Sequence, residues 1–239
     1  MKLILIGRGR MGTLIRETAL AAGDEVLAAF DVDDIDRLAE FNEKADVVID
    51  FSNPASLPSV GAFVRRTGTP LVSGTTGMSA EQKAQLEALG AYTPVLWSAN
   101  YSLGVAVLYR ALRVVSDVLK PDFDIEVTET HHNQKVDAPS GTAKLLVDAI
   151  DPEGALTPVY GREGVTGKRE KKEIGVHALR GGTVAGTHTV HFFGPDEELE
   201  FTHRAASRQI FVNGALHMAH LLPGKPNGVY DLQKILFGE

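Results

Sequence analysis

The sequence predicts an α/β chain of two domains, and three observations carry this prediction. Over the first hundred residues, short strands that are apolar throughout alternate with helical patterns, which is typical of a parallel sheet covered by helices on both faces. A glycine-rich turn joins the first of these strands to the first helix. After Ser102 the strands alternate apolar and polar residues instead, which indicates a mixed or antiparallel sheet with one exposed face.

The composition fits a globular chain and excludes several kinds of site. Of the 239 residues, 44% are hydrophobic and 23% are charged, much as in an average globular domain. With 24 Lys and Arg against 31 Asp and Glu, the formal net charge is −7, which disfavours a nucleic-acid partner. The absence of cysteine excludes disulfides and sulfur-ligated metals, and no apolar stretch approaches the roughly 20 residues of a membrane span. We therefore expect no metal, no membrane partner and a cytoplasmic location.

The first strand and helix carry a dinucleotide-binding pattern. Residues 2–6 form an apolar run, and apolar residues recur at helical spacing over 14–22. Between them, Gly7 permits a tight turn, Gly9 lets a pyrophosphate approach the backbone, and Gly12 allows the helix to pack closely on the strand. This order of elements predicts a Rossmann domain. Its candidate cofactor-binding residues in the turn are Gly7, Arg8, Gly9, Arg10, Met11 and Gly12.

An acid follows the second strand at the distance that this pattern requires. The apolar run 26–30 stops at Asp31, about 20 residues after the last glycine. Its carboxylate accepts hydrogen bonds from a ribose 2′-OH and repels a 2′-phosphate, so we expect NADH to be preferred over NADPH. Arg8 and Arg10 are able to reach an adenosine phosphate, so use of both cofactors stays open.

Further alternation completes the first sheet. Strands are expected over 45–51, 69–73 and 94–97, and helices over 56–66 and 79–89. Ligands of parallel sheets bind beyond the carboxyl ends of the strands, where two polar segments follow the strands over 69–73 and 94–97. Turn chemistry alone also accounts for such segments. The candidate cofactor-binding residues here are Gly74, Thr75, Thr76, Ser98, Ala99, Asn100 and Tyr101.

The second half has a different pattern of elements. A helix is expected over 105–119, and alternating strands over 123–130, 174–180, 183–193 and 199–205. The run Arg180-Gly181-Gly182-Thr183 between two of them indicates a hairpin.

After Arg208 a last helical pattern extends through Leu222, and with it the chain is expected to return to the first domain. We expect a dinucleotide-binding domain over 1–102 and 209–239, and a substrate-binding and oligomerisation domain over 103–208. Two charged runs, 170–173 and 196–198, are interpreted as solvated loops.

One cluster in this half carries most of the chemistry. The amides of Gly141 and Thr142 are expected at the start of a helix over 143–150, where the helix dipole attracts anions. Lys135 adds a full positive charge a few residues away, so this segment predicts a carboxylate or phosphate site. His131 and His132 end a strand and are expected to point to opposite faces, which disfavours a shared metal.

Histidine titrates near neutrality, so His131 or His132 is a candidate proton donor. Each of these residues also has a structural interpretation, with the histidines hydrogen-bonded, Lys135 solvated and Ser140 capping the helix. His217 and His220 are interpreted as an ordinary helix face. The residues alone indicate a reductase that acts on an acidic substrate.

At this cluster the sequence resembles the dihydrodipicolinate reductase family, also called 4-hydroxy-tetrahydrodipicolinate reductase. The run THHNQKVDAPSGTA at 130–143 carries the resemblance and is far more specific than the glycine pattern. It extends along nearly the whole chain. The other matching segments are IGRGRMG at 6–12, IDFSNP at 49–54, SGTTG at 73–77, SANYS at 98–102, GREGVTG at 161–167, IGVHALRGGTVAGTH at 174–188 and THRAASR at 202–208.

The resemblance implies a nicotinamide-dependent reduction of 4-hydroxy-tetrahydrodipicolinate to tetrahydrodipicolinate in lysine and diaminopimelate biosynthesis. It implies catalytic roles for His131 as proton donor and for Lys135 as second donor or electrostatic helper. The substrate-binding residues are expected to be His132, Ser140, Gly141 and Thr142. The family's usual assembly implies a homotetramer formed through the sheets of the second domain.

Two other interpretations remain open. A related Rossmann dehydrogenase acting on aspartate or an aspartate-derived aldehyde predicts turnover with a simple amino acid or aldehyde. A nonenzymatic redox sensor predicts NADH binding without turnover, and it gives no reason for a histidine, a lysine and a helix start to lie together.

Overall fold

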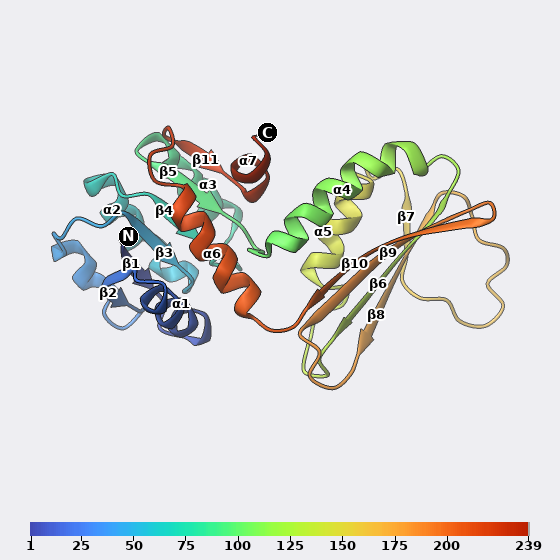
Figure 1. Cartoon of the computed structure of the whole chain (residues 1–239), viewed down its shortest axis with the longest axis horizontal. Helices are drawn as coiled ribbons and strands as arrows, with labels where there is room; N and C mark the ends of the chain where they lie inside the picture. The colour runs from blue at the N-terminus through green and yellow to red at the C-terminus, as the bar shows by residue number, and fades with distance from the viewer. Residues whose placement is uncertain (239) are drawn as a thin grey trace. The chain divides into compact units, whose positions relative to one another are not determined.

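A computed structural model describes residues 1–238, and its contacts divide the chain into two compact units (Figure 1). Unit 1 comprises residues 1–102 together with the chain from Gln209 onward, and unit 2 comprises residues 103–208. Unit 1 contains a parallel sheet and unit 2 a mixed sheet, so the predicted α/β fold class is confirmed. No helix of the described residues is both long and apolar enough to cross a membrane.

Unit 1 is built on a six-stranded parallel sheet in the order β11-β5-β4-β3-β1-β2. The strands are β1 (Lys2–Ile6), β2 (Glu25–Phe30), β3 (Val47–Asp50), β4 (Leu71–Ser73), β5 (Pro94–Trp97) and β11 (Gly228–Tyr230). The helices are α1 (Arg10–Ala21), α2 (Leu57–Thr67), α3 (Ala80–Ala88), α6 (Gln209–Leu221) and α7 (Leu232–Phe237). Short 3₁₀ turns occupy Ile35–Glu40, Pro54–Ser56 and Leu89–Ala91.

The helices of unit 1 begin and end where their sequence dictates. At the start of α3, the Ser79 hydroxyl accepts a hydrogen bond from the Gln82 amide, and the Gln82 side chain accepts one from the Ser79 amide. Helix α2 ends at Gly68, whose φ of 67° lies in the left-handed region that glycine adopts without strain. The central strands β1 and β3 are buried almost throughout, as expected for strands covered on both faces.

Unit 2 is a five-stranded mixed sheet in the order β10-β9-β6-β8-β7. Its strands are β6 (Asp124–His131), β7 (Thr157–Val159), β8 (Glu173–Arg180), β9 (Gly186–Gly194) and β10 (Glu197–Ala205). Its helices, α4 (Leu103–Leu119) and α5 (Gly141–Ile150), lie side by side on one face of the sheet (Figure 1). Strand β6 alternates strictly, and Ile125 and Val127 pack into the core beneath these helices. We call the opposite face of the sheet the outer face.

The predicted hairpin at Arg180-Gly181-Gly182-Thr183 is wrong. Strand β8 pairs in parallel with β6, β6 pairs antiparallel with β9, and so β6 lies between β8 and β9. The turn carries the chain across the end of β6 instead. There the Gly181 amide donates to the His131 carbonyl at 2.9 Å, and the Asn133 amide donates to the Gly182 carbonyl at 3.2 Å.

The hairpin of this sheet joins β9 to β10 through a tight turn in which Asp196 has a φ of 60°. Glu197 and Glu198 therefore belong to β10, and Glu173 begins β8, although all three were interpreted as loop charges. The return of the chain through α6 agrees with the sequence pattern. Strands β7 and β11 and helix α7 were not predicted, and β11 extends the parallel sheet beside β5.

Candidate active site

The glycine turn of unit 1 leaves space where a pyrophosphate is expected. A Cβ at Gly7 would collide with the Phe51 carbonyl, and a Cβ at Gly12 would collide with the Gly7 carbonyl. Only glycine fits at these two positions. Gly9 has nothing within 4 Å of such a Cβ, so the backbone is open there. It is also the N-cap of α1, which has no side-chain cap and no acid in its first turn. These residues fit a dinucleotide phosphate held by backbone amides.

Asp31 lies directly after β2, beside the glycine turn. One of its oxygens accepts a hydrogen bond from the Arg8 amide at 2.6 Å, and the other accepts one from the Val32 amide at 2.8 Å. The bonds from the Arg8 and Val32 amides hold the pKa of the Asp31 carboxyl below its usual value, so it is charged at neutral pH. The Arg8 guanidinium pairs with Asp34 at 3.0 Å, and Arg10 is exposed.

The two polar segments follow β4 and β5 directly, so the parallel sheet brings residues 74–76 and 98–101 to one edge. Four of their side chains, those of Thr75, Ser98, Asn100 and Tyr101, make hydrogen bonds within the fold. The Thr75 hydroxyl accepts a hydrogen bond from the Ser52 amide at 3.0 Å. Tyr101 is 1% exposed, and its hydroxyl donates to the carbonyl that ends β4 at 2.7 Å. Thr76 and Ala99 are exposed at this edge, as is appropriate for contact with a ligand.

A buried carboxylate that the sequence analysis did not single out supports this edge. Asp50 ends β3 and accepts hydrogen bonds from the hydroxyls of Ser52 at 2.5 Å and Ser73 at 3.1 Å. Burial raises the pKa of Asp50 above its usual value, and the serine bonds oppose this change. We assign it a structural role, because it joins the ends of the adjacent strands β3 and β4.

A hollow of about 580 Å³ lies at the opposite edge of the same sheet. Its lining includes Asp46, Pro70 and Pro94, which precede or begin β3, β4 and β5. Ligands of parallel sheets bind at the carboxyl ends of the strands, so this hollow is separate from the candidate site. A smaller hollow of about 420 Å³ borders the glycine turn at Gly7 and Arg8.

In unit 2, the end of β6 gathers the second set of predicted residues. Because side chains two apart share a face of a strand, Glu129 and His131 both follow the buried side of β6. The Nδ1 atom of His131 lies 2.6 Å from Glu129 Oε2, and the His131 residue is 9% exposed. Its ring meets that of His188, on the neighbouring strand β9, edge to face at 5.1 Å.

Glu129 is the centre of this cluster, although the sequence analysis did not name it. Its two oxygens accept a bidentate pair of bonds from Arg180 at 2.8 Å each, and one from the Ser140 amide at 3.0 Å. Burial alone would raise the pKa of Glu129, but the bonds from Arg180, His131 and the Ser140 amide outweigh it and hold the pKa below its usual value. The alternation of β6 was a usable signal, since Glu129 falls on its apolar face.

Ser140 caps helix α5, as the structural interpretation expected. Its hydroxyl accepts a hydrogen bond from the Ala143 amide at 3.1 Å and lies 3.0 Å from His188 Nε2. At 2% exposure, Ser140 has its side chain engaged within the fold. Burial lowers the pKa of His188 to about 4, so this histidine is neutral at neutral pH. Gly141 is exposed and Thr142 half-buried at the first turn of α5.

The loop between β6 and α5 carries the lysine. Lys135 Nζ donates to Asp137 at 2.8 Å, and the Lys135 amide donates to the His132 carbonyl at 3.1 Å. The bond from Lys135 lowers the pKa of Asp137. His132 is half-buried. Unit 2 thus brings a lysine, a helix start and a histidine held by a carboxylate to one end of its sheet.

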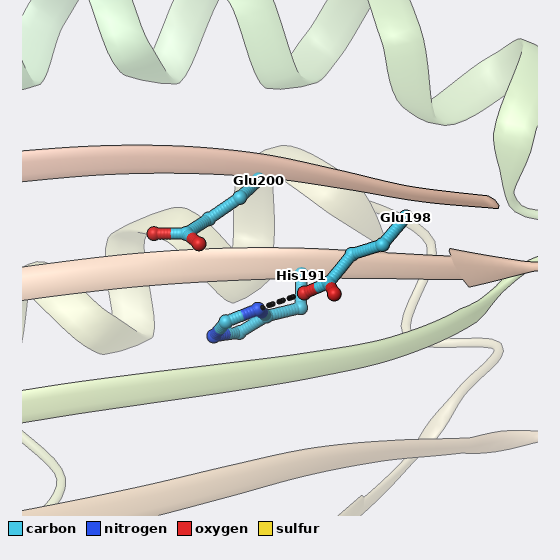
Figure 2. A group of neighbouring side chains, drawn as sticks. All are labelled: His191, Glu198 and Glu200. Atoms are coloured by element: carbon cyan, nitrogen blue, oxygen red, sulfur yellow. Dashed lines mark hydrogen bonds and ion pairs between the residues drawn. The ribbon is translucent and has the colours of Figure 1, made fainter.

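One group elsewhere in the described chain could hold a metal ion, although the sequence predicted none. His191, Glu198 and Glu200 place ligand atoms within 4.8 Å of one another on the outer face (Figure 2). His191 Nδ1 lies 2.8 Å from Glu198 Oε1, and both glutamates are exposed. This group faces away from Glu129 and is separate from the candidate active site.

Comparison with known proteins agrees with the geometry. Residues 1–101 match the family described as "Dihydrodipicolinate reductase, N-terminus", and residues 104–236 match "Dihydrodipicolinate reductase, C-terminus". A 4-hydroxy-tetrahydrodipicolinate reductase from Exiguobacterium sp. is 43% identical, with 98% of this chain and 95% of the relative covered. One from Clostridium tetani is 40% identical, with 99% and 97% covered. The solved structure of a dipicolinate-bound dihydrodipicolinate reductase from Paenisporosarcina sp. TG-14 has a TM-score of 0.78 at 21% identity, with 99% of each chain covered.

Proposed function

Since the chain belongs to the dihydrodipicolinate reductase family, we propose that it reduces 4-hydroxy-tetrahydrodipicolinate (dihydrodipicolinate) to tetrahydrodipicolinate with NAD(P)H in lysine and diaminopimelate biosynthesis. The observation that carries this proposal is the match along both units at above 40% identity to a curated reductase. The chain is thus an oxidoreductase that depends on a nicotinamide cofactor.

The cofactor is assigned to unit 1. Gly7, Gly9 and Gly12 would place the first-turn amides of α1 against its pyrophosphate, and Asp31 would accept hydrogen bonds from its ribose. The backbone and exposed side chains of residues 74–76 and 98–101 would contact the nicotinamide end of the cofactor. When bound, the cofactor supplies a hydride. The residues of unit 1 supply position and no proton.

The substrate is assigned to unit 2. It carries two carboxylates, and the first turn of α5 at Gly141 and Thr142 offers backbone amides and a positive dipole end for one of them. Lys135 offers a full charge on the adjoining loop, and His132 a further donor. Ser140 would act through the helix start that it caps, because its own hydroxyl is engaged.

The proton is assigned to His131. Overall the reaction removes one water from the hydroxylated ring and adds a hydride and a proton. Negative charge builds on the ring as the hydride arrives, so a positioned imidazolium that donates a proton there lowers the barrier. Because His131 Nδ1 bonds to Glu129, Nε2 is the nitrogen available to donate. Lys135 would stabilise the same developing charge.

We further propose that NADH is preferred, that the chain forms a homotetramer through its unit 2 sheets, and that it acts in the cytoplasm. The ionised Asp31 supports the cofactor preference. The outer face supports the assembly, because the helices cover only the other face of that sheet. Light scattering coupled to gel filtration measures the subunit number, and a monomeric mass at micromolar concentration would contradict the assembly. Fractionation of the source cells tests the location.

The test of the function couples the preceding synthase to this protein and follows NADH and NADPH oxidation separately. Turnover that depends on the synthase product is the expected result. Turnover only with aspartate or an aspartate-derived aldehyde would favour the related dehydrogenase. NADH binding without any turnover would favour the redox sensor.

A further inference from the structure

We propose that Glu129, neutralised in part by Arg180, is the positioning residue of the proton donor. It fixes the tautomer of His131, and replacing Glu129 or Arg180 should change the pH range over which the enzyme turns over. This inference rests on the proposed function, since it assigns a role within the same reaction.

The hydrogen bonds of Glu129 hold its carboxylate in one orientation. The residue is 1% exposed, and both its oxygens accept two hydrogen bonds each. The donors come from three different elements, namely His131 on β6, Arg180 on β8 and the Ser140 amide before α5. A carboxylate held from three directions cannot rotate away from the imidazole, so the ring of His131 is held as well.

This contact selects one nitrogen of His131 for chemistry. A charged carboxylate accepts hydrogen bonds and donates none, so Nδ1 must carry a proton. The proton that His131 gains and loses is therefore on Nε2. A Cβ at Gly186 would come within 3.1 Å of that atom, so the glycine leaves the space beside Nε2 open.

The charges around His131 divide between those that favour and those that oppose the imidazolium. Glu129 favours it, and Arg180, directly opposite His131 in the β6–β8 register, opposes it by neutralising that carboxylate. His188 on β9 is neutral at neutral pH, and burial lowers the pKa of His203 on β10 as well. The loop adds Lys135, which Asp137 pairs. Glu129 is therefore the charged group in direct contact with the His131 ring, and Arg180 is paired with it.

This pairing makes opposite predictions for the two partners. Glu129→Gln removes the negative charge and leaves Arg180 uncompensated, so the alkaline pH at which kcat falls should move down by about one unit or more. Arg180→Gln leaves the carboxylate unneutralised. The alkaline limb of the pH profile, which is the pH range over which kcat falls, should therefore move up. A merely structural ion pair would move neither limb in protein that still folds. In Glu129→Gln, kcat should also fall about 10-fold or more, with the KM for NADH unchanged.

A matched control lies on the other face of the same strand. Glu126 accepts a bidentate pair from Arg162 at 2.9 Å and lies 2.7 Å from His177 Nε2, which repeats the carboxylate, arginine and histidine set on the outer face. Glu126→Gln should leave kcat and the alkaline limb at their wild-type values. Gel filtration of each variant ensures that proteins of the same assembly state are compared.

A measurement on the wild-type protein covers the case in which the variants fail to fold. Nitrogen-15 NMR of labelled histidine, with His131→Asn used for assignment, should find the neutral ring of His131 protonated at Nδ1. A neutral ring protonated at Nε2, or limbs that stay fixed in both folded variants, would overturn the proposal. If the wild type fails to turn over the synthase product, the proposed reaction fails, while the tautomer still tests the Glu129 contact.

Discussion

At the scale of single residues, the assignment of His131 as proton donor makes the most direct prediction. His131→Ala removes the group that protonates the ring, so kcat should fall about 10²- to 10⁴-fold, the usual contribution of a general acid. Steady-state kinetics with the coupled substrate measures it. His217→Ala is the control, because His217 is exposed on α6 and should leave kcat unchanged. A His131→Ala enzyme within 3-fold of wild type, on the scale of such contributions, would remove the assignment.

Asp31 makes a second prediction at this scale. Its ionised carboxylate would repel a 2′-phosphate, so Asp31→Ser should raise the ratio of kcat/KM for NADPH to that for NADH about 10-fold or more. Asp33→Ser removes the same charge from an exposed position nearby and should change the ratio little. Equal ratios in the two variants would mean that long-range charge, rather than contact with the ribose, sets the preference.

The residues that the sequence identified, and those it missed, differ in a physical way. His131 and Lys135 were found because they belong to a run of polar residues and a helix start. Glu129 and Arg180 lie 51 positions apart, and only the parallel pairing of β6 with β8 brings them together. The periodicity of one strand places Glu129 on the buried face. It does not identify Arg180, whose positive charge offsets the free-energy cost of burying the Glu129 carboxylate.

At the scale of elements, the cap of α5 supports both stability and the site. Ser140→Ala removes the acceptor of the Ala143 amide and the partner of a buried histidine, so the free energy of unfolding should fall by about 1 to 3 kcal/mol. Ser79→Ala removes the exposed cap of α3 in unit 1 and should cost about 1 kcal/mol. Urea unfolding followed by circular dichroism measures both, since the single tryptophan, Trp97, reports on unit 1 alone.

The same two variants should differ in kinetics. The substrate KM should rise in Ser140→Ala, because the amides of Gly141 and Thr142 lose the constraint that orients them. It should stay unchanged in Ser79→Ala. An unchanged KM in both would separate the helix start from substrate binding.

Most elements could be predicted with their ends to within a few residues, and the failures had two causes, the pairing of strands and the shortness of an element. Strands such as β1 and β5 were found to the residue, because a buried parallel strand is an uninterrupted apolar run. The Gly181-Gly182 turn was wrongly assigned to a hairpin, since a tight turn has the same sequence whether the next strand pairs locally or crosses a neighbour. Strand β11 was missed because three residues are too short to show a period.

At the scale of the whole molecule, the division into two units predicts two separable binding responses. Unit 1 is assembled from both ends of the chain and is assigned the cofactor, and unit 2 is continuous and is assigned the dicarboxylate. A ligand at about 100 times its Kd stabilises the folded state by about 2.7 kcal/mol. Pyridine-2,6-dicarboxylate and NADH should therefore each raise the Tm by about 5 °C or more.

Lys135→Ala should separate the two responses. It removes a positive charge from the dicarboxylate site, so most of the Tm shift with pyridine-2,6-dicarboxylate should disappear, while the shift with NADH stays. Lys144→Ala removes an exposed lysine from α5 and controls for the loss of one charge from a chain whose net charge is already −7. In kinetics, Lys135→Ala should raise KM and lower kcat together, because the same charge faces the bound substrate and the charge that develops on it. If Lys135→Ala keeps the full Tm shift with pyridine-2,6-dicarboxylate, unit 2 binds the diacid through the start of α5 without Lys135. The assigned role of Lys135 would then be wrong.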